Sequence, residues 1–190
     1  MSFYNLAVKT VYGLFRVFLL FKVKGNENIP KDGAFLLCSN HRAYRDAVLL
    51  ALGCRRQLTF MAKDDLFKKP FLGRLIKALG AFPIKRGRGD AAAVMATLKI
   101  MKKGGATVIF PEGTRVKDGS RKKINSGIIR LAAQSNVPIV PAFLTSNSVT
   151  YGEPISYEKY TESIQDVDVM QNLADELMDT IYSLGEENEK

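Results

Sequence analysis

The sequence predicts an α/β fold, with a single domain built on a central, mostly parallel sheet flanked by helices. The chain has 190 residues, of which 46% are hydrophobic, and this amount suits one core but is short for two domains. From residue 23 onward, short apolar runs alternate with stretches of helical periodicity. Such alternation is typical of parallel sheets whose strands are joined by helices. Residues 23–190 contain no repeat or linker, so we expect them to form one domain.

The expected strands are short apolar runs bounded by turn residues. They are residues 34–39, 58–62, 82–84, 106–110 and 139–144, the last begun by Pro138 and interrupted by Pro141. The expected helices have apolar residues at helical spacing, and the third of them ends at a pair of glycines. They are residues 46–52, 70–79, 91–103, 127–134 and 169–184.

The most apolar stretch of the chain is residues 3–21. On a helix, Asn5, Lys9 and Arg16 fall near one line and form a narrow polar stripe. A core helix or a membrane span is the alternative, but charges within a span are costly, whereas a helix lying in the membrane plane can turn them outward. We therefore expect residues 1–22 to form an amphipathic helix that anchors the chain to a membrane.

Charge is distributed unevenly along the chain. Residues 1–150 contain 26 Lys/Arg against 8 Asp/Glu, and residues 151–190 contain 2 against 11, so a net +18 and a net −9 give +9. A body this basic is drawn to nucleic acid, anionic lipid or phosphorylated small molecules. Aromatic residues are not interleaved with its Lys/Arg clusters, as stacking on bases requires, so we expect no nucleic-acid partner.

Two cysteines, Cys38 and Cys54, lie among apolar residues, so we expect two free, buried thiols. We expect no metal site. His41 is the only histidine, and it follows an expected buried strand. Asp46 can orient the imidazole of His41 only if the chain bends between them, as at a strand-to-helix turn. The alternative is a surface histidine beside a helix-capping Asp.

A second group of polar residues, 110–115 (FPEGTR), also follows an expected buried strand. Its Pro and Gly enforce a bend that can point backbone N–H groups, the Thr114 hydroxyl and the Arg115 guanidinium at one phosphate. An ordinary turn with a surface ion pair is the alternative. The basic run 80–86 reads by itself as a solvated patch.

Four motifs occur in order: NHxxxxD at 40–46, GxxPIxR at 80–86, FPEGTR at 110–115 and VPIVP at 137–141. Together they resemble the lysophosphatidic acid acyltransferase branch of the glycerolipid acyltransferase family, over roughly residues 23–150. The resemblance implies an acyltransferase domain at 23–190 that uses no cofactor. Its substrates would be an acyl thioester, of coenzyme A or acyl carrier protein, and a lysophospholipid. We expect the sn-2 hydroxyl of lysophosphatidic acid as acceptor, and phosphatidic acid as product in phospholipid biosynthesis.

The resemblance also implies the residues of the site. His41 would be the catalytic base and Asp46 its orienting acid. Arg86 would contact the acceptor phosphate, and Pro138 and Pro141 would lie near the donor. The substrate-binding residues of the third motif would be Glu112, Gly113, Thr114 and Arg115. The implied location is the cytoplasmic face of the cell membrane, with peripheral or monotopic attachment.

Some positions depart from the family pattern, and they bear on the acceptor's head group. They are Ala43, Arg45, Lys85 and Ser126. A different lysolipid acceptor therefore remains an alternative. A thioesterase and a non-catalytic module that binds anionic lipid are separate alternatives, and the module would need no His41–Asp46 pair. A GxSxG motif is absent from the sequence, which agrees with direct attack by the acceptor hydroxyl.

Overall fold

The computed structural model describes residues 21–84, 89–116, 124, 126–161 and 166–186. Residues 1–20 of the expected anchor helix, and Arg86 of the expected site, lie outside the described residues. Among the described residues, no helix combines the length and the hydropathy needed to cross a membrane.

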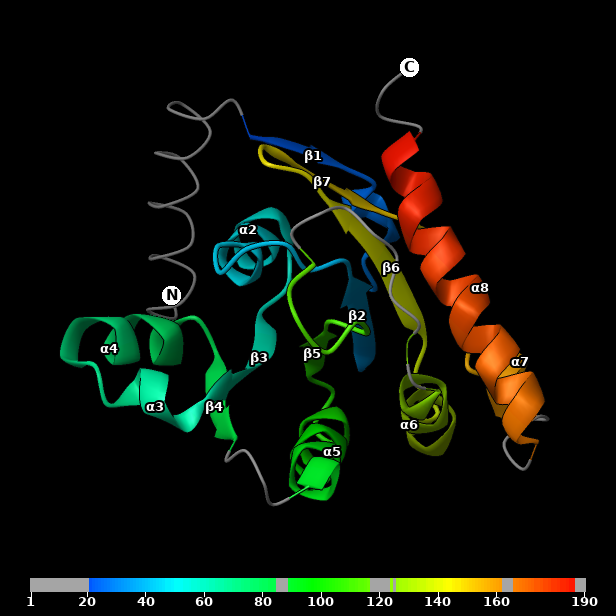
Figure 1. Ribbon diagram of the computed structural model, residues 1–190. Coiled ribbons are helices and arrows are strands. Elements are labelled where there is room, and N and C mark those ends of the chain that lie inside the picture. Colours follow the sequence, from blue (N-terminus) through cyan, green and yellow to red (C-terminus); the bar gives the residue numbers. More distant parts are fainter. Residues whose placement is uncertain (1–20, 85–88, 117–123, 125, 162–165, 187–190) are drawn as a thin grey trace.

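The described strands form one seven-stranded sheet, of which Figure 1 gives the arrangement. They are β1 (Lys22–Lys24), β2 (Phe35–Ser39), β3 (Leu58–Lys63), β4 (Ala81–Ile84), β5 (Ala106–Ile109), β6 (Ile139–Leu144) and β7 (Ser148–Tyr151). Their order is β1-β7-β6-β2-β5-β3-β4, and every neighbouring pair is parallel except β6 and β7. The predicted α/β class with a mostly parallel sheet is confirmed.

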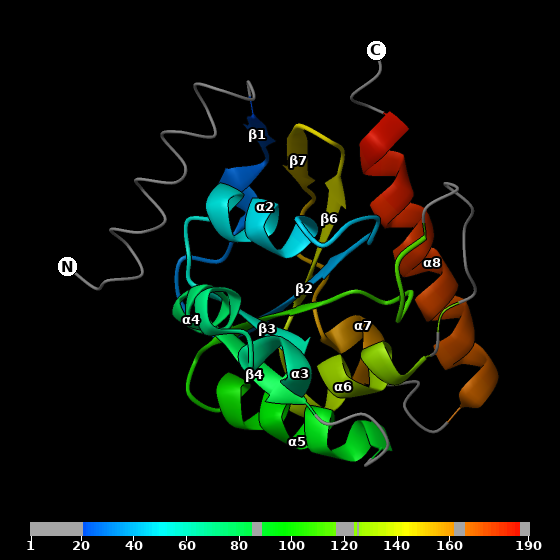
Figure 2. The same cartoon turned by 60° about the vertical axis from the view of Figure 1, so that its left-hand side comes forward.

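Helices cover both faces of this sheet (Figure 2). The described helical segments are η1 (Asn26–Asn28), α2 (Asp46–Gly53), α3 (Asp64–Phe67), α4 (Pro70–Ala78), α5 (Gly89–Met101), α6 (Gly127–Ser135), α7 (Glu158–Thr161) and α8 (Val167–Glu186). Strand β2 is buried along its whole length because it is sandwiched between two cores. Its Leu36 and Cys38 pack with α6 and α8, whereas Phe35 and Leu37 point to the opposite face and pack with α2.

Each expected strand and helix is present, with ends within two residues of those predicted. Strands β1 and β7 were not predicted, because they are short and each has only one aliphatic residue, Val23 or Val149. Pro141 does not interrupt β6 as expected. The β6–β7 pairing covers only Ala142–Leu144, so the N–H that Pro141 lacks falls outside that ladder, while its carbonyl accepts from Gly152 N–H at 2.8 Å.

The strand order reverses between β2 and β5, which are neighbours. Strand β2 leads through α2 to β3, on the far side of β5, and β5 leads through α6 to β6, on the far side of β2. The two crossovers lie on opposite faces of the sheet. A crevice at the carboxyl ends of two such strands is where open α/β sheets bind ligands. The NHxxxxD segment follows β2 there, and FPEGTR follows β5.

Candidate active site

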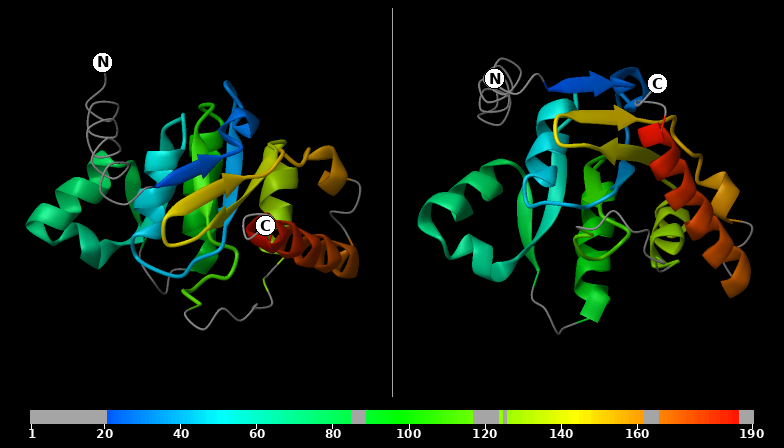
Figure 3. Two further views of the ribbon diagram at one scale, coloured as in Figure 1. Left: turned by 90° about the horizontal axis from the view of Figure 1, so that it is seen from above. Right: turned by 45° about the horizontal axis from the view of Figure 1, so that its top comes forward.

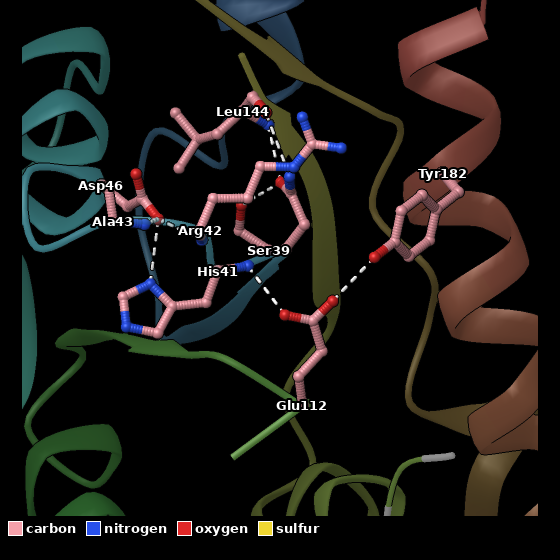
Figure 4. A network of polar contacts seen from close by, with 9 residues as sticks. Ser39, His41, Arg42, Ala43, Asp46, Glu112, Leu144 and Tyr182 are labelled. Carbon is pink, nitrogen blue, oxygen red and sulfur yellow. Dashed lines mark hydrogen bonds and ion pairs between the residues drawn. The ribbon is translucent and has the colours of Figure 1, made fainter. Parts of the chain in front are cut away.

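The turn after β2 brings His41 and Asp46 together (Figure 4). Asp46 is the first residue of α2, and its Oδ2 lies 2.9 Å from His41 Nδ1. The same oxygen accepts the N–H groups of Arg42 at 2.6 Å and Ala43 at 2.7 Å. These two bonds fold the turn back on itself. The Asp46 carboxylate therefore both contacts the imidazole and holds the bend that lets the two side chains meet.

Asp46 is ionised in this setting. Burial opposes its negative charge, but hydrogen bonds from the His41 ring and from the N–H groups of Ala43 and Arg42 outweigh burial and lower the pKa of the carboxyl below its ordinary value of 3.8. An ionised carboxylate only accepts hydrogen bonds, so His41 Nδ1 carries the hydrogen. The lone pair of the neutral ring is then on Nε2, and Nε2 is the atom that can take a proton from a substrate.

The segment after β5 holds His41 from the other side. The Phe110 ring stacks on the imidazole, with centroids 3.9 Å apart and planes 16° from parallel. Glu112 Oε2 accepts the His41 backbone N–H at 2.9 Å, and Val116 N–H donates to the His41 carbonyl at 2.8 Å. The segment after β5 therefore holds both the ring and the backbone of His41 in place.

Glu112 is buried, and its carboxylate faces the protein. While Oε2 contacts His41, Oε1 accepts the hydroxyl hydrogen of Tyr182 at 2.8 Å. Figure 4 shows Glu112 between His41 and the α8 residue Tyr182. The resemblance implied a substrate contact for Glu112, whereas in the structure both of its oxygens accept hydrogen bonds from protein groups.

Gly113 and Thr114 are exposed in the same turn, and Arg115 is half-buried. Gly113 has φ +66°, a left-handed conformation that suits glycine, and its N–H bonds to the Phe110 carbonyl at 3.0 Å. Thr114 is exposed, and the Arg115 guanidinium lies 3.8 Å over the ring of Tyr44, which is 73% exposed in the His41 turn. The structure thus places Arg115 beside the turn that carries His41.

Sequence reasoning missed the contributions of Asn40 and Tyr182. Buried Asn40 donates to the Leu144 carbonyl at 3.0 Å and accepts the Leu144 N–H at 2.7 Å, which ties the end of β2 to the end of β6. Its position directly before His41 was a signal that could have been used. Tyr182 lies 70 residues from Glu112, on a helix that is predicted from its apolar periodicity. The local sequence therefore does not indicate its contact with Glu112.

A cavity of about 530 Å³ lies beside this network, at the carboxyl end of β6. The residues that line it include Arg42, Tyr182, and Lys22 and Lys24 of β1. Among the described residues, no group of three or more His, Cys, Asp or Glu side chains is placed to hold a metal ion. Cys38 and Cys54 are both free and buried, as predicted.

Comparison with known proteins identifies relatives over most of the chain. A family model described as Acyltransferase matches residues 20–145. A Bacillus subtilis (strain 168) 1-acyl-sn-glycerol-3-phosphate acyltransferase is 32% identical over 122 residues, covering 64% of this chain and 60% of that protein. The chloroplastic 1-acyl-sn-glycerol-3-phosphate acyltransferase LPAT1 of Arabidopsis thaliana is 33% identical over 139 residues, covering 71% of this chain and 37% of that protein.

A solved structure shares the fold. The crystal structure of the 1-acyl-sn-glycerophosphate (LPA) acyltransferase PlsC from Thermotoga maritima superposes with a TM-score of 0.71, covering 100% of this chain and 85% of that one. The two sequences are 22% identical, so the likeness concerns the fold. The chain spans less than two thirds of the length of the Bacillus and Arabidopsis relatives.

Proposed function

The chain belongs to the Acyltransferase family, and from this premise we propose that it transfers a fatty-acyl group from a thioester donor to the sn-2 hydroxyl of lysophosphatidic acid, giving phosphatidic acid. The observation that carries the proposal is the hydrogen bond between His41 Nδ1 and Asp46 Oδ2. It lies at the carboxyl end of β2, where the strand order of the sheet reverses. It leaves Nε2 of the only histidine as the base.

In the proposed reaction, His41 Nε2 takes the proton of the glycerol hydroxyl while the hydroxyl oxygen attacks the thioester carbonyl carbon. The tetrahedral intermediate collapses with cleavage of the C–S bond, and the leaving thiolate takes the proton back from His41. Asp46 stabilises the imidazolium formed in between. The acceptor is itself the nucleophile, so no covalent enzyme intermediate is needed.

The phosphate of the acceptor is proposed to bind at the turn after β5. A guanidinium is well suited to bidentate phosphate binding, and Arg115 lies beside the His41 turn. Thr114 and the backbone at Gly113 are exposed on the same turn. Arg86 is proposed to complete the phosphate site. Glu112 is proposed to act through His41, whose backbone it holds, rather than through the substrate.

Attachment to the membrane is part of the proposal, because the acceptor and the product are both amphiphiles. Residues 1–22 are proposed to anchor the chain in the plane of the cytoplasmic face of the membrane. The donor is an acyl thioester of coenzyme A or of acyl carrier protein. Deletion of residues 1–21 is expected to reduce sedimentation with liposomes, and undiminished sedimentation would remove the anchor from the proposal.

One assay tests the chemistry. Release of free thiol from acyl-CoA, and from acyl carrier protein charged with the same acyl chain, is measured with and without lysophosphatidic acid, for the wild type and for His41→Ala. We expect release that requires the acceptor and is abolished in the variant. Release without acceptor would indicate a thioesterase, absence of release a binding module, and full activity of His41→Ala would exclude the mechanism.

A further inference from the structure

Helix α4 turns three of its four large apolar side chains outward. Of its nine residues only Gly73 is buried, whereas Phe71 is 86%, Leu75 51% and Leu72 37% exposed. A helix that connects two parallel strands normally packs its apolar stripe on the sheet. The exposed side chains of α4 require another explanation.

The packing of α4 fixes this orientation. A Cβ atom added to Gly73 would lie 2.4 Å from the carbonyl oxygen of Phe67, so α4 contacts α3 at closest range through its one glycine. Phe71, Leu72 and Leu75 lie on another side of the helix, since Leu75 is three residues from Leu72 and four from Phe71, and such spacings share a face. We call these three residues the α4 face. Figure 3 shows α3 and α4 standing off one edge of the sheet, on the opposite side of the molecule from α8.

Exposed cations lie in α4 and directly before it. Four exposed basic residues lie in or next to the helix: Lys68, Lys69, Arg74 and Lys77. Of these, Lys68 pairs with Asp65 of α3 at 2.8 Å. An apolar face with basic neighbours matches the surface of an anionic bilayer, in which hydrocarbon lies beneath negatively charged head groups. A second copy of this chain fits less well, because a two-fold contact through the α4 face would bring like charges together.

We propose that the α4 face inserts into the head-group region of a membrane that contains anionic lipid. The sheet gives this contact a consequence for the site. Strand β3 is parallel to β5 and runs directly into α3, so the α3–α4 unit begins at the carboxyl edge of the sheet, where His41 and Arg115 lie. If the proposed function holds, docking through α4 brings that edge to the lipid that supplies the acceptor.

The absence of tryptophan from the sequence permits a sharp test. Phe71→Trp, made in the full chain, gives one fluorophore on the α4 face. Met95→Trp on α5 is the matched control, because Met95 is 66% exposed and lies outside the α4 face. Emission is recorded with vesicles of phosphatidylcholine alone, with vesicles that also contain phosphatidylglycerol, and with brominated lipids. We expect a shift to shorter wavelength and quenching by brominated lipid for Phe71→Trp on anionic vesicles, and neither for Met95→Trp.

A charge variant tests the basic neighbours. Lys69→Ala in the Phe71→Trp background is expected to weaken binding to anionic vesicles by roughly fivefold, the effect of removing one cation near the surface. Its effect on vesicles of phosphatidylcholine alone is expected to be small.

Three results would overturn the proposal. The first is unchanged Phe71→Trp emission while the protein sediments with vesicles, and the second is no binding to vesicles. The third is blue-shifted emission protected from acrylamide before vesicles are added, which indicates that protein covers the α4 face. None of these depends on acyl transfer, which is measured separately with a short-chain lysolipid below its micelle concentration. Failure of the docking proposal and failure of the proposed function are therefore distinguishable.

Discussion

The backbone N–H of His41 donates to Glu112 Oε2 at 2.9 Å, and this bond joins the turn after β2 to the turn after β5. The same carboxyl group accepts the Tyr182 hydroxyl hydrogen from α8, so three elements far apart in the sequence meet at one buried side chain. The imidazole is therefore positioned by its own turn, through Asp46, and by a neighbouring strand and a distant helix, through Glu112.

Glu112→Leu is expected to damage this arrangement. Leucine has no acceptor, so the His41 N–H and the Tyr182 hydroxyl both lose their partner at a buried site, whereas in Glu112→Gln the amide oxygen can accept from the His41 N–H and the Tyr182 hydroxyl can turn to accept from the amide NH2. Leaving buried donors unpaired lowers the free energy of unfolding by about 1–3 kcal/mol. Because His41 shifts when its backbone loses this hydrogen bond, we also expect turnover to fall about tenfold or more. Steady-state kinetics and urea denaturation measure the two effects.

Tyr182→Phe is the control for Glu112→Leu. It removes one donor and leaves the bond to the His41 N–H, so we expect a loss of about 1 kcal/mol in the free energy of unfolding and nearly unchanged turnover. Equal losses of turnover in the two variants would contradict the separate role of the His41–Glu112 bond.

The parts of this site that could be predicted are those encoded in short segments. The strand-to-helix turn was readable because an apolar run precedes His41 and a helix follows it, and the bend implied that Asp46 could reach the ring. The contacts of Glu112 were not readable, since the burial of its carboxylate depends on how β5 pairs with β2 and how α8 packs on β6. The contact of Tyr182 with Glu112 and the continuity of β6 through Pro141 also depend on how distant segments pair and pack. A local sequence pattern does not encode such pairing.

Stability should depend on pH through Asp46. The folded pKa of its carboxyl is lowered, so the unfolded state binds the proton more tightly, and the stabilisation is present above the unfolded pKa and lost as pH falls through the folded pKa. We expect the free energy of unfolding of the wild type to fall more steeply than that of Asp46→Asn between about pH 5 and pH 3. Urea denaturation at a series of pH values measures this, and parallel curves would show that Asp46 contributes nothing to acid sensitivity.

Tyr44 is expected to hold Arg115 in place for the acceptor. Its ring lies 3.8 Å under the guanidinium, and such contacts at exposed sites are worth about 0.5–1 kcal/mol. Tyr44→Leu should therefore raise the KM for lysophosphatidic acid about two- to fivefold at unchanged kcat, whereas Tyr44→Phe, which keeps the ring, should not. A change confined to kcat would assign Tyr44 a different role.

The cysteines are expected to be inert. Burial raises the pKa of Cys54 to about 11, and burial also raises the pKa of Cys38, which is fully buried. Since the thiolate is the reactive form, iodoacetamide at pH 8 should leave the folded protein unlabelled and its activity unchanged. Mass spectrometry before and after unfolding in urea provides the comparison. Rapid labelling of the native protein together with loss of turnover would point to a thiol nucleophile and against direct attack by the acceptor.

Gly113 should matter for backbone conformation alone. A Cβ atom there would meet nothing within 4 Å, but φ is +66°, which costs an L-residue about 1–2 kcal/mol and asparagine less. We expect Gly113→Ala to lower kcat/KM for the acceptor by relaxing the turn that carries Thr114 and Arg115, and Gly113→Asn to retain more activity. The matched control is Gly33→Ala, where φ is +77° and the space is equally open. Gly33 precedes β2, at the opposite end from His41, so its replacement should reduce stability similarly and leave kcat/KM unchanged. Similar losses of kcat/KM in the two alanine variants would mean that activity follows global stability, and the turn after β5 would then have no special part in binding the acceptor.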